Sequence, residues 1–392
     1  FIAEYGSGFP IIGVLAEFDA LPGISQEVAT VRKPIANKKG GHACGHHLFG
    51  TASTAAAIAI KKYLTKTNTK GTIRLYGTPA EEGGSGKVYM VRAGLFDDVD
   101  IVLDWHASDK NAASPATSMA NRSAKFRFYG YSAHAAGAPE KARSSLDAVE
   151  AMNFMVNLMR EHIPDGSRIH YVITKGGNAP NVVPDFAEVF YYVRDFDVDI
   201  LEKLWTRLIN TAEAAALGTG TKMEYEIIHG NRPVLPNEVA QKVMYDNLVQ
   251  VGGISYNRIE KKFAKEIYKT LIEPGLSLNS AQNIQPYQFT KGKGSTDVGD
   301  VSWKTPTARL RVATWVPGTS AHTWQAVAAG GMSIGMKGMI NASKVLVGTA
   351  IDLYDNPTTI KNAKTELIER RGPGFNYYSM LGDRKPPLDY RK

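Results

Sequence analysis

Residues 71–86 read GTIRLYGTPAEEGGSG, in which a short apolar strand runs into two carboxylates and a glycine-rich turn. Apolar runs and helical patterns alternate on both sides of this stretch, which predicts strands at 11–18 and 99–105 and helices at 48–64 and 88–94. Near-continuous apolar strands that alternate with helices are typical of a mostly parallel sheet covered on both faces. Residues 1–116 are therefore expected to belong to an α/β domain.

The next segment, residues 117–231, has a different order of elements. Its pattern predicts strand, helix, strand, strand, helix and strand at 124–129, 144–162, 168–174, 186–194, 200–217 and 222–228. This β-α-β-β-α-β order is the ferredoxin-like pattern. We expect residues 117–231 to form a separate α+β domain.

The third segment, residues 232–392, predicts helices at 238–251, 257–270 and 325–354, a strand at 308–315 and a loop-like tail at 370–392. If its strand completes the sheet of the first segment, residues 1–116 and 232–392 form one discontinuous α/β domain. Residues 117–231 are then an inserted lid. The chain begins at Phe1 inside an expected strand, so we expect further residues to precede it.

Composition excludes several classes of protein. A single Cys rules out a disulfide framework, and no uncharged stretch is both long and uninterrupted enough to span a membrane. Lys and Arg number 46 against 38 Asp and Glu, but they are scattered and not interleaved with aromatic residues, so nucleic-acid binding is not expected. A mild positive field suits small anionic substrates. No signal peptide is visible, which favours a cytoplasmic location.

The sequence HACGHH at residues 42–47 gathers three of the nine His residues and the only Cys at the start of an expected helix. Thiolate and imidazole are ligands that suit zinc, manganese or cobalt. The cluster therefore predicts a divalent metal site. Two other interpretations stay open, namely a glycine turn that happens to contain histidines and a reactive Cys44 paired with a histidine.

Two carboxylates, Glu81 and Glu82, directly follow the strand at 71–78. Adjacent carboxylates at a strand end tend to point in different directions, so one can bind metal while the other transfers protons. The glycines that follow allow the backbone to approach a site closely. Taken alone, the same four residues also fit a solvated acidic turn.

Three further polar residues stand at the ends of expected strands, which is where open α/β sheets hold their sites. His106 and His322 are candidate metal ligands, and Asp19 is a candidate to orient a ligand histidine. On pattern alone, both histidines also fit ordinary surface positions and Asp19 also fits a turn. A ligand at His322 would join the first and third segments into one domain.

Seven motifs occur in a fixed order along the chain: HACGHH, PAEEGGSGK, the strand-end His106, YSAHAA, NAPNVVPD, GSTDVGDVSW and GTSAHTW. In order and spacing they resemble the M20 metallopeptidase family, and most closely its amidohydrolase branch, over nearly the whole chain. The resemblance implies one or two divalent ions (Mn or Zn), held by Cys44, His46, Glu82, His106 and His322. It implies that Glu81 is the general base. The chain departs from the family at His47, where relatives usually carry Asp or Asn, and at Ala107, where they usually carry Pro.

The resemblance also gives roles to three residues of the 117–231 segment. His134 matches the lid histidine that reaches the active site of a neighbouring subunit, and Asn181 and Arg194 lie where relatives hold the carboxylate of the substrate. The residue pattern alone would assign His134 to a surface loop and Asn181 to a turn. It would give Arg194 a surface salt bridge with Asp195 or Asp197.

The expected protein is thus a metal-dependent amidohydrolase that cleaves a small anionic N-acyl or N-aroyl amino acid, with p-aminobenzoyl-glutamate as the first candidate. The resemblance implies a homodimer formed through the lid, and a second hydrolase subunit is a further candidate partner. The alternatives are another N-acyl-amino-acid or dipeptide hydrolase of this family, a thiol hydrolase that uses Cys44, and a non-catalytic subunit of a two-subunit hydrolase.

Overall fold

The computed structural model describes residues 1–388, and residues 389–392, the end of the expected loop-like tail, lie outside the described part. The chain divides into two compact units. The first comprises residues 1–116, 235–291 and 301–377, and the second comprises, among the described residues, 117–234, 292–300 and 378–388. Residues 292–300 and residues 378–388 of the tail thus group with the second unit, whereas the sequence pattern placed them with the first.

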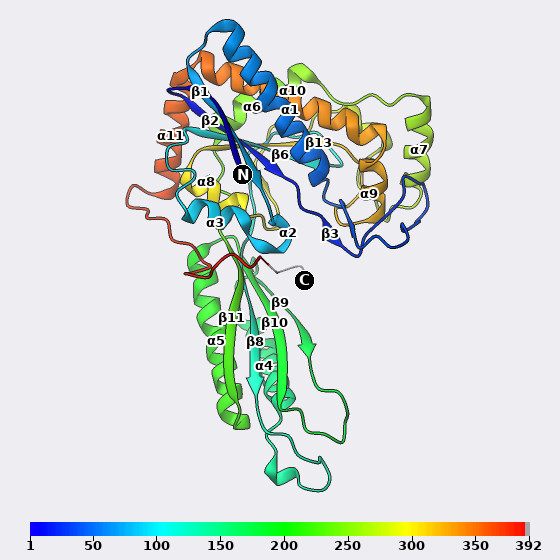
Figure 1. Cartoon of the computed structure of the whole chain (residues 1–392), viewed down its shortest axis with the longest axis vertical. Coiled ribbons are helices and arrows are strands. Elements are labelled where there is room, and N and C mark those ends of the chain that lie inside the picture. The colour runs from blue at the N-terminus through cyan, green and yellow to red at the C-terminus, as the bar shows by residue number, and fades with distance from the viewer. Residues whose placement is uncertain (389–392) are drawn as a thin grey trace. The chain divides into compact units, whose positions relative to one another are not determined.

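A five-stranded sheet forms the centre of the first unit (Figure 1). Its order is β1 (Ile2–Ser7), β5 (Gly71–Thr78), β2 (Ile11–Glu17), β6 (Ile101–Ser108) and β13 (Thr307–Ala313). Only the edge strand β1 runs antiparallel to its neighbour, and the other four strands are parallel. The predicted α/β class with a mostly parallel sheet is confirmed.

Helices from both halves of the chain pack on this sheet or around the helices that do so. The long ones are α1 (His46–Thr67), α6 (Glu238–Val251), α10 (Ser333–Asp355) and α11 (Pro357–Arg371), and the shorter ones are α2 (Glu81–Gly84), α3 (Gly86–Arg92), α7 (Arg258–Tyr268), α8 (Val298–Lys304) and α9 (Trp324–Gly330). Helix α1 packs against β2, β5 and α10, while α6 packs against β13 and α10. The first and third segments of the sequence therefore share one core.

The expected helix at 325–354 is divided into α9 and α10. The break falls at Gly330 and Gly331, two residues of low helix propensity. A side chain at Gly330 would meet the His47 ring, since an added Cβ would lie 3.1 Å from His47 Cε1. The close approach of His47 thus explains why glycine stands where the helix ends.

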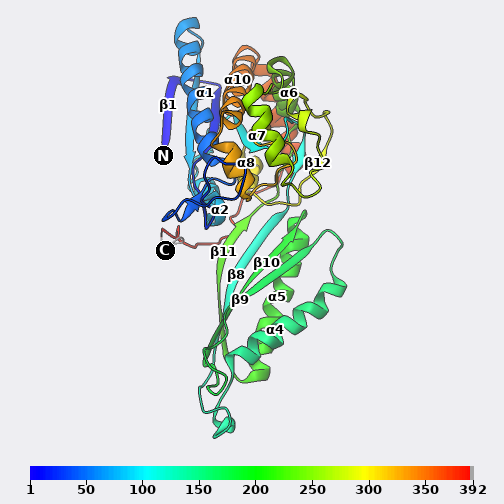
Figure 2. The ribbon, with the colours of Figure 1, turned by 90° about the vertical axis from the view of Figure 1, so that its right-hand side faces the viewer.

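The second unit is a four-stranded antiparallel sheet with two helices on one side (Figure 2). Along the chain its elements are β8 (Ala120–Tyr129), α4 (Ser145–Met159), β9 (Arg168–Lys175), β10 (Phe186–Asp195), α5 (Val198–Thr219) and β11 (Lys222–Asn231). The strands lie in the spatial order β11-β8-β10-β9. A ferredoxin-like sheet built from a β-α-β-β-α-β chain has the same order. Its core is formed where Phe126, Val149 and Leu204 meet between sheet and helices.

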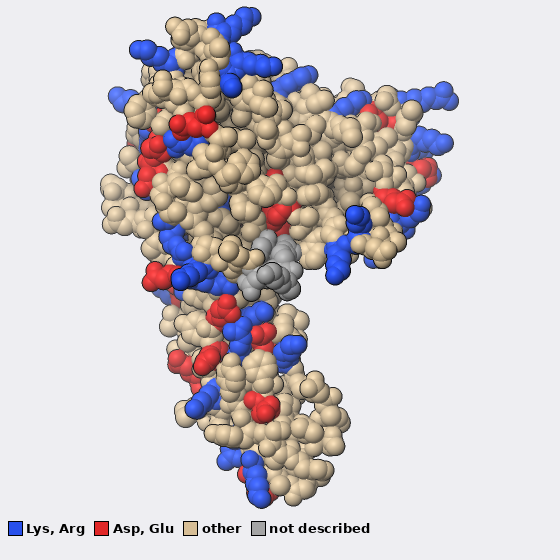
Figure 3. Space-filling model, in the orientation of Figure 1, with Lys and Arg blue, Asp and Glu red and all other residues tan. Residues whose placement is uncertain are grey.

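The remaining elements are short. They are the strands β3 (Leu21–Pro22), β4 (Gly40–Gly41), β7 (Ala116–Thr117) and β12 (Thr290–Lys291), and the 3-10 turns at Pro139–Lys141, Arg160–His162 and Leu278–Gln282. Among the helices described in residues 1–388, none has the length and apolar character needed to cross a lipid bilayer. On the face drawn in Figure 3, Lys and Arg are dispersed among acidic and uncharged side chains, in keeping with their scatter in the sequence.

Candidate metal centre

The candidate ligands of the first unit gather at the carboxyl edge of its parallel strands, where α/β sheets hold their sites. Asp19 follows β2, and Glu81 and Glu82 follow β5. His106 lies inside β6, which extends to Ser108 and is longer at this end than the expected strand. His322 lies in the loop after β13, and its backbone N–H donates to the carbonyl of Ala43 at 3.0 Å.

A tight turn brings Cys44 and His46 to this edge. Gly45 between them has φ of 79°, a left-handed conformation that L side chains rarely adopt. A Cβ on Gly45 would lie 2.3 Å from the Cβ of Ala107, so only glycine allows the turn to contact β6. His46 then begins helix α1.

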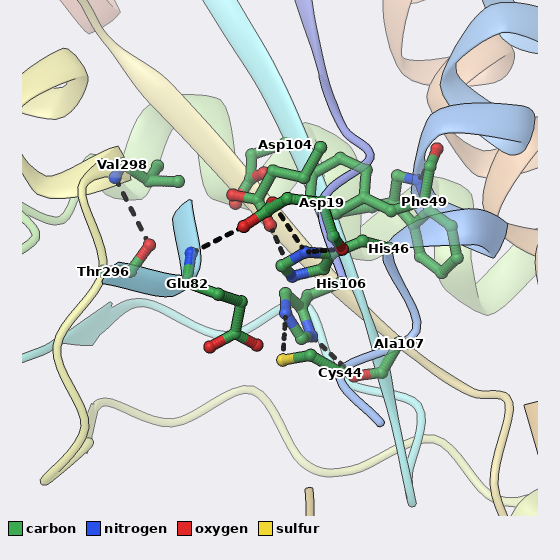
Figure 4. Close-up of polar contacts among 12 residues, drawn as sticks. Asp19, Cys44, His46, Phe49, Glu82, Asp104, His106, Ala107, Thr296 and Val298 are labelled. Atoms are coloured by element: carbon green, nitrogen blue, oxygen red, sulfur yellow. Dashed lines mark hydrogen bonds and ion pairs between the residues drawn. The ribbon is translucent and has the colours of Figure 1, made fainter. Parts of the chain in front are cut away.

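Two of the three sets of close donor atoms in this region share Cys44, and Figure 4 labels Cys44, His46, Glu82 and His106 among their members. Cys44, His46 and His106 form one set, and Cys44 with Glu82 and His322 forms the other, with the donor atoms of each set within 4.8 Å of one another. Cys44 Sγ lies 3.4 Å from His106 Nε2, and His322 Nε2 lies 3.1 Å from Glu82 Oε1. Because Cys44 belongs to both sets, its sulfur would be available as a ligand in either of them.

Hydrogen bonds on the other ring nitrogens orient these histidines. His46 Nδ1 lies 3.1 Å from Asp19 Oδ1, and His106 Nδ1 lies 2.7 Å from the carbonyl of Ala107. Each leaves its Nε2 for the centre, which is the arrangement usual for metal-binding histidines. Asp19 also accepts the backbone N–H of Glu82 through Oδ2 at 2.8 Å, so it links two candidate ligands.

A buried ion pair lies directly behind His46. Glu17 Oε1 is 2.5 Å from Lys87 Nζ, and both side chains are almost completely buried. The second carboxylate oxygen, Oε2, lies 3.0 Å from His46 Nε2. Within residues 1–388, Glu17 Oε2 and His46 Nε2 have no hydrogen-bond partner beyond this contact with each other, although both are buried. Polar atoms left in this way fit a cation at this position.

The electrostatics of Cys44 argue against a thiol nucleophile. Burial raises the pKa of the Cys44 thiol to about 12, and burial lowers the pKa of His106 to about 3. Reactive cysteines need a lowered pKa, which forms the thiolate at neutral pH. A neutral His106 is, by contrast, the form that ligates metal. Together with the donor set of sulfur, nitrogen and carboxylate oxygen, these side chains fit a zinc-type or manganese-type ion.

In the second unit, His134 and Asn181 come together in the loops beyond β8 and β9. His134 forms a backbone bridge with Val182, and the N–H of Ala135 donates to the Asn181 carbonyl at 3.0 Å. The exposed His134 ring accepts the N–H groups of Ala136 and Gly137 at Nδ1, at 3.2 and 3.1 Å. A neutral ring then carries its proton on Nε2, which is available as a donor.

Arg194 lies at the opposite end of β10 from these loops. About 26 Å of strand separates Phe186 from Arg194 at about 3.3 Å per residue, so the structure does not bring Arg194 and Asn181 together. Its guanidinium lies 5.3 Å from the centre of the Tyr192 ring, and burial lowers its pKa. The described residues include no ion pair of Arg194 with Asp195 or Asp197, since Asp195 instead accepts Ser167 and the Asp197 N–H.

Several residues of the centre were missed by reasoning from the sequence. Glu17 was visible only as the one charge in an apolar strand, and Lys87 only as the residue after a glycine-rich turn. Arg311 lies beside His106 on the neighbouring strand and had no signal in its strand pattern. Pairing across the sheet decides these neighbours, and a single sequence does not contain it.

The chain is similar to several known proteins. The model of peptidase family M20/M25/M40 matches residues 13–266. The chain is 40% identical over 393 residues to one of the subunits of p-aminobenzoyl-glutamate hydrolase from Escherichia coli (strain K12), and the match covers 93% of this chain and 82% of that protein. It is 28% identical over 361 residues to the Xaa-Arg dipeptidase of Mus musculus, which covers 91% of this chain and 73% of that one.

Among solved structures, the Bacillus subtilis YXEP protein, described as a dinuclear metal binding peptidase from the M20 family, has a similar fold. The TM-score is 0.54 at 17% sequence identity, over 88% of this chain and 84% of that one. The fold, the donor set and the relatives define a metal-dependent amidohydrolase. The chain belongs to peptidase family M20/M25/M40.

Proposed function

We propose that this protein hydrolyses the amide bond of N-aroyl or N-acyl amino acids, and that p-aminobenzoyl-glutamate, cleaved to p-aminobenzoate and glutamate, is its best substrate. The relative at 40% identity carries that substrate in its name and matches over nearly the whole chain. The second candidate is a dipeptide or another N-acyl amino acid, which the similarity to a dipeptidase favours.

The observation that carries the proposal is the shared position of Cys44 in two donor sets. We assign one or two divalent ions, manganese or zinc, to these sets, with His46 and His106 on one side of Cys44 and Glu82 and His322 on the other. Such an ion, when bound, supplies Lewis-acid chemistry and makes a water nucleophilic near neutral pH. The role of Asp19 is to hold His46 and the backbone of Glu82 in place.

The protein's own groups then handle protons and charge. Glu81 lies with Glu17 and His46 in a third group of close donor atoms, so it is near enough to take a proton from water and return it to the leaving amine. The Nε2–H of His134 donates a hydrogen bond to the oxyanion that develops on the amide carbonyl. Asn181 and Arg194 hold the carboxylate of the substrate.

The second unit is the lid and dimerisation domain in this proposal. His134 and Asn181 lie at one end of its sheet, and Arg194 lies at the end where the chain enters the unit near Thr117. Groups so far apart suit two different sites. Arg194 would then act in one site of a homodimer, and His134 and Asn181 of the same chain in the other.

A partner and a cellular location are also part of the proposal. The name of the Escherichia coli protein describes it as one subunit of a hydrolase, so we propose that a second, different hydrolase subunit joins this chain. Cys44 must stay reduced to bind metal, which fits a cytoplasmic location.

The test is release of p-aminobenzoate from p-aminobenzoyl-glutamate by purified protein supplied with Mn²⁺ or Zn²⁺, with and without a chelator. Turnover that the chelator abolishes is expected. Turnover that resists the chelator and is abolished by a thiol reagent would support the thiol hydrolase. Substrate binding without turnover, in the presence of metal, would support the non-catalytic subunit. A parallel set of dipeptides and N-acyl amino acids separates the first candidate from the second.

A further inference from the structure

The edge strand β13 carries an arginine beside the metal centre that the mechanism has not used. Arg311 pairs in register with His106 on β6, and neighbours paired across a sheet point to the same face. The preceding pair on this face, Arg309 and Asp104, confirms the alignment, because its side chains form an ion pair at 2.7 Å. Arg311 therefore lies on the same face of the sheet as His106, and it is nearer than Arg309 to the carboxyl edge of the sheet.

The backbone of Arg311 is fixed on both sides. It pairs with β6, and on its other side its N–H donates to the Ala112 carbonyl at 2.7 Å, while the N–H of Ala112 donates back at 2.9 Å. Arg311 is nevertheless exposed, although its neighbours in β13 are largely buried. The exposed surface therefore belongs to the side chain, which is held at a defined place on a rigid strand.

No carboxylate of residues 1–388 neutralises Arg311 through an ion pair. The two acids whose charges reach it are engaged elsewhere. Asp104 is paired with Arg309, and Asp109 accepts Ser108 Oγ at 3.2 Å and the Gly318 N–H at 3.3 Å. Burial and the charge of Arg309 lower the pKa of Arg311, although the residue is exposed to solvent.

A free cation next to a cation-binding centre is unfavourable unless an anion joins them. Guanidinium matches carboxylate geometry with two parallel hydrogen bonds. The position thus suits an anionic group of the molecule whose amide lies at the metal centre.

We propose that Arg311 is a specificity-determining residue that binds a second carboxylate of the substrate, so that the enzyme selects N-acyl derivatives of an acidic amino acid over those of neutral ones. The proposal rests on the proposed function and deepens it. In that function, Arg194 and Asn181 hold the α-carboxylate. The side-chain carboxylate of an acidic residue such as glutamate is left for Arg311, in the first unit.

The test compares two substrates that differ in one group, p-aminobenzoyl-glutamate and p-aminobenzoyl-glutamine. For Arg311→Met we expect kcat/KM for the glutamate compound to fall about 10- to 100-fold, the range of one hydrogen-bonded charge pair. The value for the glutamine compound should stay near that of the wild type. Arg311→Lys should recover part of the loss. Arg258→Met, which removes an exposed cation from helix α7, is the matched control and should change neither value.

Equal losses for both substrates, or no loss for either, would overturn the proposal. A change of oligomeric state in Arg311→Met, seen by size-exclusion chromatography, would show that Arg311 binds a neighbouring chain instead. Affinities of both compounds for metal-loaded Glu81→Gln separate this proposal from the proposed function. If wild type hydrolyses neither compound but the glutamate compound binds more tightly through Arg311, the proposed function fails and the assignment of Arg311 stands. If both compounds are hydrolysed and bind equally, the proposed function stands and the assignment of Arg311 fails.

Discussion

Cys44 is the residue on which the metal centre depends, and its burial has a measurable consequence. Its pKa is raised to about 12, so without metal the thiol is protonated at neutral pH. Glu17 and Asp19 outweigh burial and raise the pKa of His46, which is therefore protonated as well. A metal binds only the deprotonated forms, so binding must release protons and affinity must rise with pH.

We predict net proton release on titration of Zn²⁺ into metal-free protein at pH 7. Calorimetry in two buffers of different ionisation enthalpy measures it. Cys44→Ala should bind metal more weakly and release fewer protons. Full metal occupancy in this variant, with unchanged proton release, would remove Cys44 from the ligand set.

Glu81 has a role that can be separated from that of its neighbour Glu82. Glu81→Gln keeps the shape of the side chain but cannot accept a proton, so we predict retained metal and a kcat lower by about 10²–10⁴. Glu82→Gln should instead lose metal. Metal analysis beside steady-state kinetics makes the comparison. A Glu81→Gln enzyme with the wild-type rate would refute the base, and one without metal would make Glu81 a ligand.

At the scale of elements, the buried ion pair between Lys87 and Glu17 joins helix α3 to strand β2. Lys87→Met leaves protonated His46 as the remaining cation beside the buried Glu17 carboxylate, and breaking a buried pair costs at most about 3–5 kcal/mol. We predict a loss of that order in the free energy of unfolding, measured by urea denaturation of metal-free protein. The double variant with Glu17→Gln should recover most of it. Equal stability of wild type and Lys87→Met would contradict the buried pair.

The elements themselves were largely predictable, because apolar periodicity follows burial. The strand at Gly71–Thr78 and the helix at Glu238–Val251 have the expected bounds, and the strand order of the second unit suits the pattern seen in its sequence. The division at Gly330 and Gly331 was not predicted, although both residues have low helix propensity. The contact of His47 with Gly330 comes from another part of the chain and has no local signal.

The candidate site was predictable to a similar extent. Strand-end residues such as His106 and His322 could be proposed because parallel strands end at one edge. The neighbours that tune the centre could not, because Glu17, Lys87 and Arg311 acquire their meaning only through pairing between strands and helices. The roles of His134 and Arg194 came from resemblance, and the structure adds that they lie at opposite ends of one sheet.

At the scale of the whole molecule, the proposal that His134 acts in a second subunit leads to a complementation test. His134→Ala and Glu81→Gln homodimers should each be nearly inactive. A heterodimer of the two has one site with both residues intact, so activity should return when the chains are mixed and exchanged. The control is a mixture of two Glu81→Gln preparations, which should stay inactive. Verified heterodimers without activity, or a fully active monomer, would show that His134 does not act between subunits.

The central claim is that this chain builds a metal centre that hydrolyses N-acyl amino acids. The most direct measurement is the hydrolysis of p-aminobenzoyl-glutamate by chelator-stripped protein as Mn²⁺ or Zn²⁺ is returned stepwise, with bound metal determined in the same samples. We predict that stripped protein is inactive and that activity rises with bound metal until one or two ions per chain are present. Full activity in stripped protein, or no p-aminobenzoate release when metal is fully restored, would contradict the account.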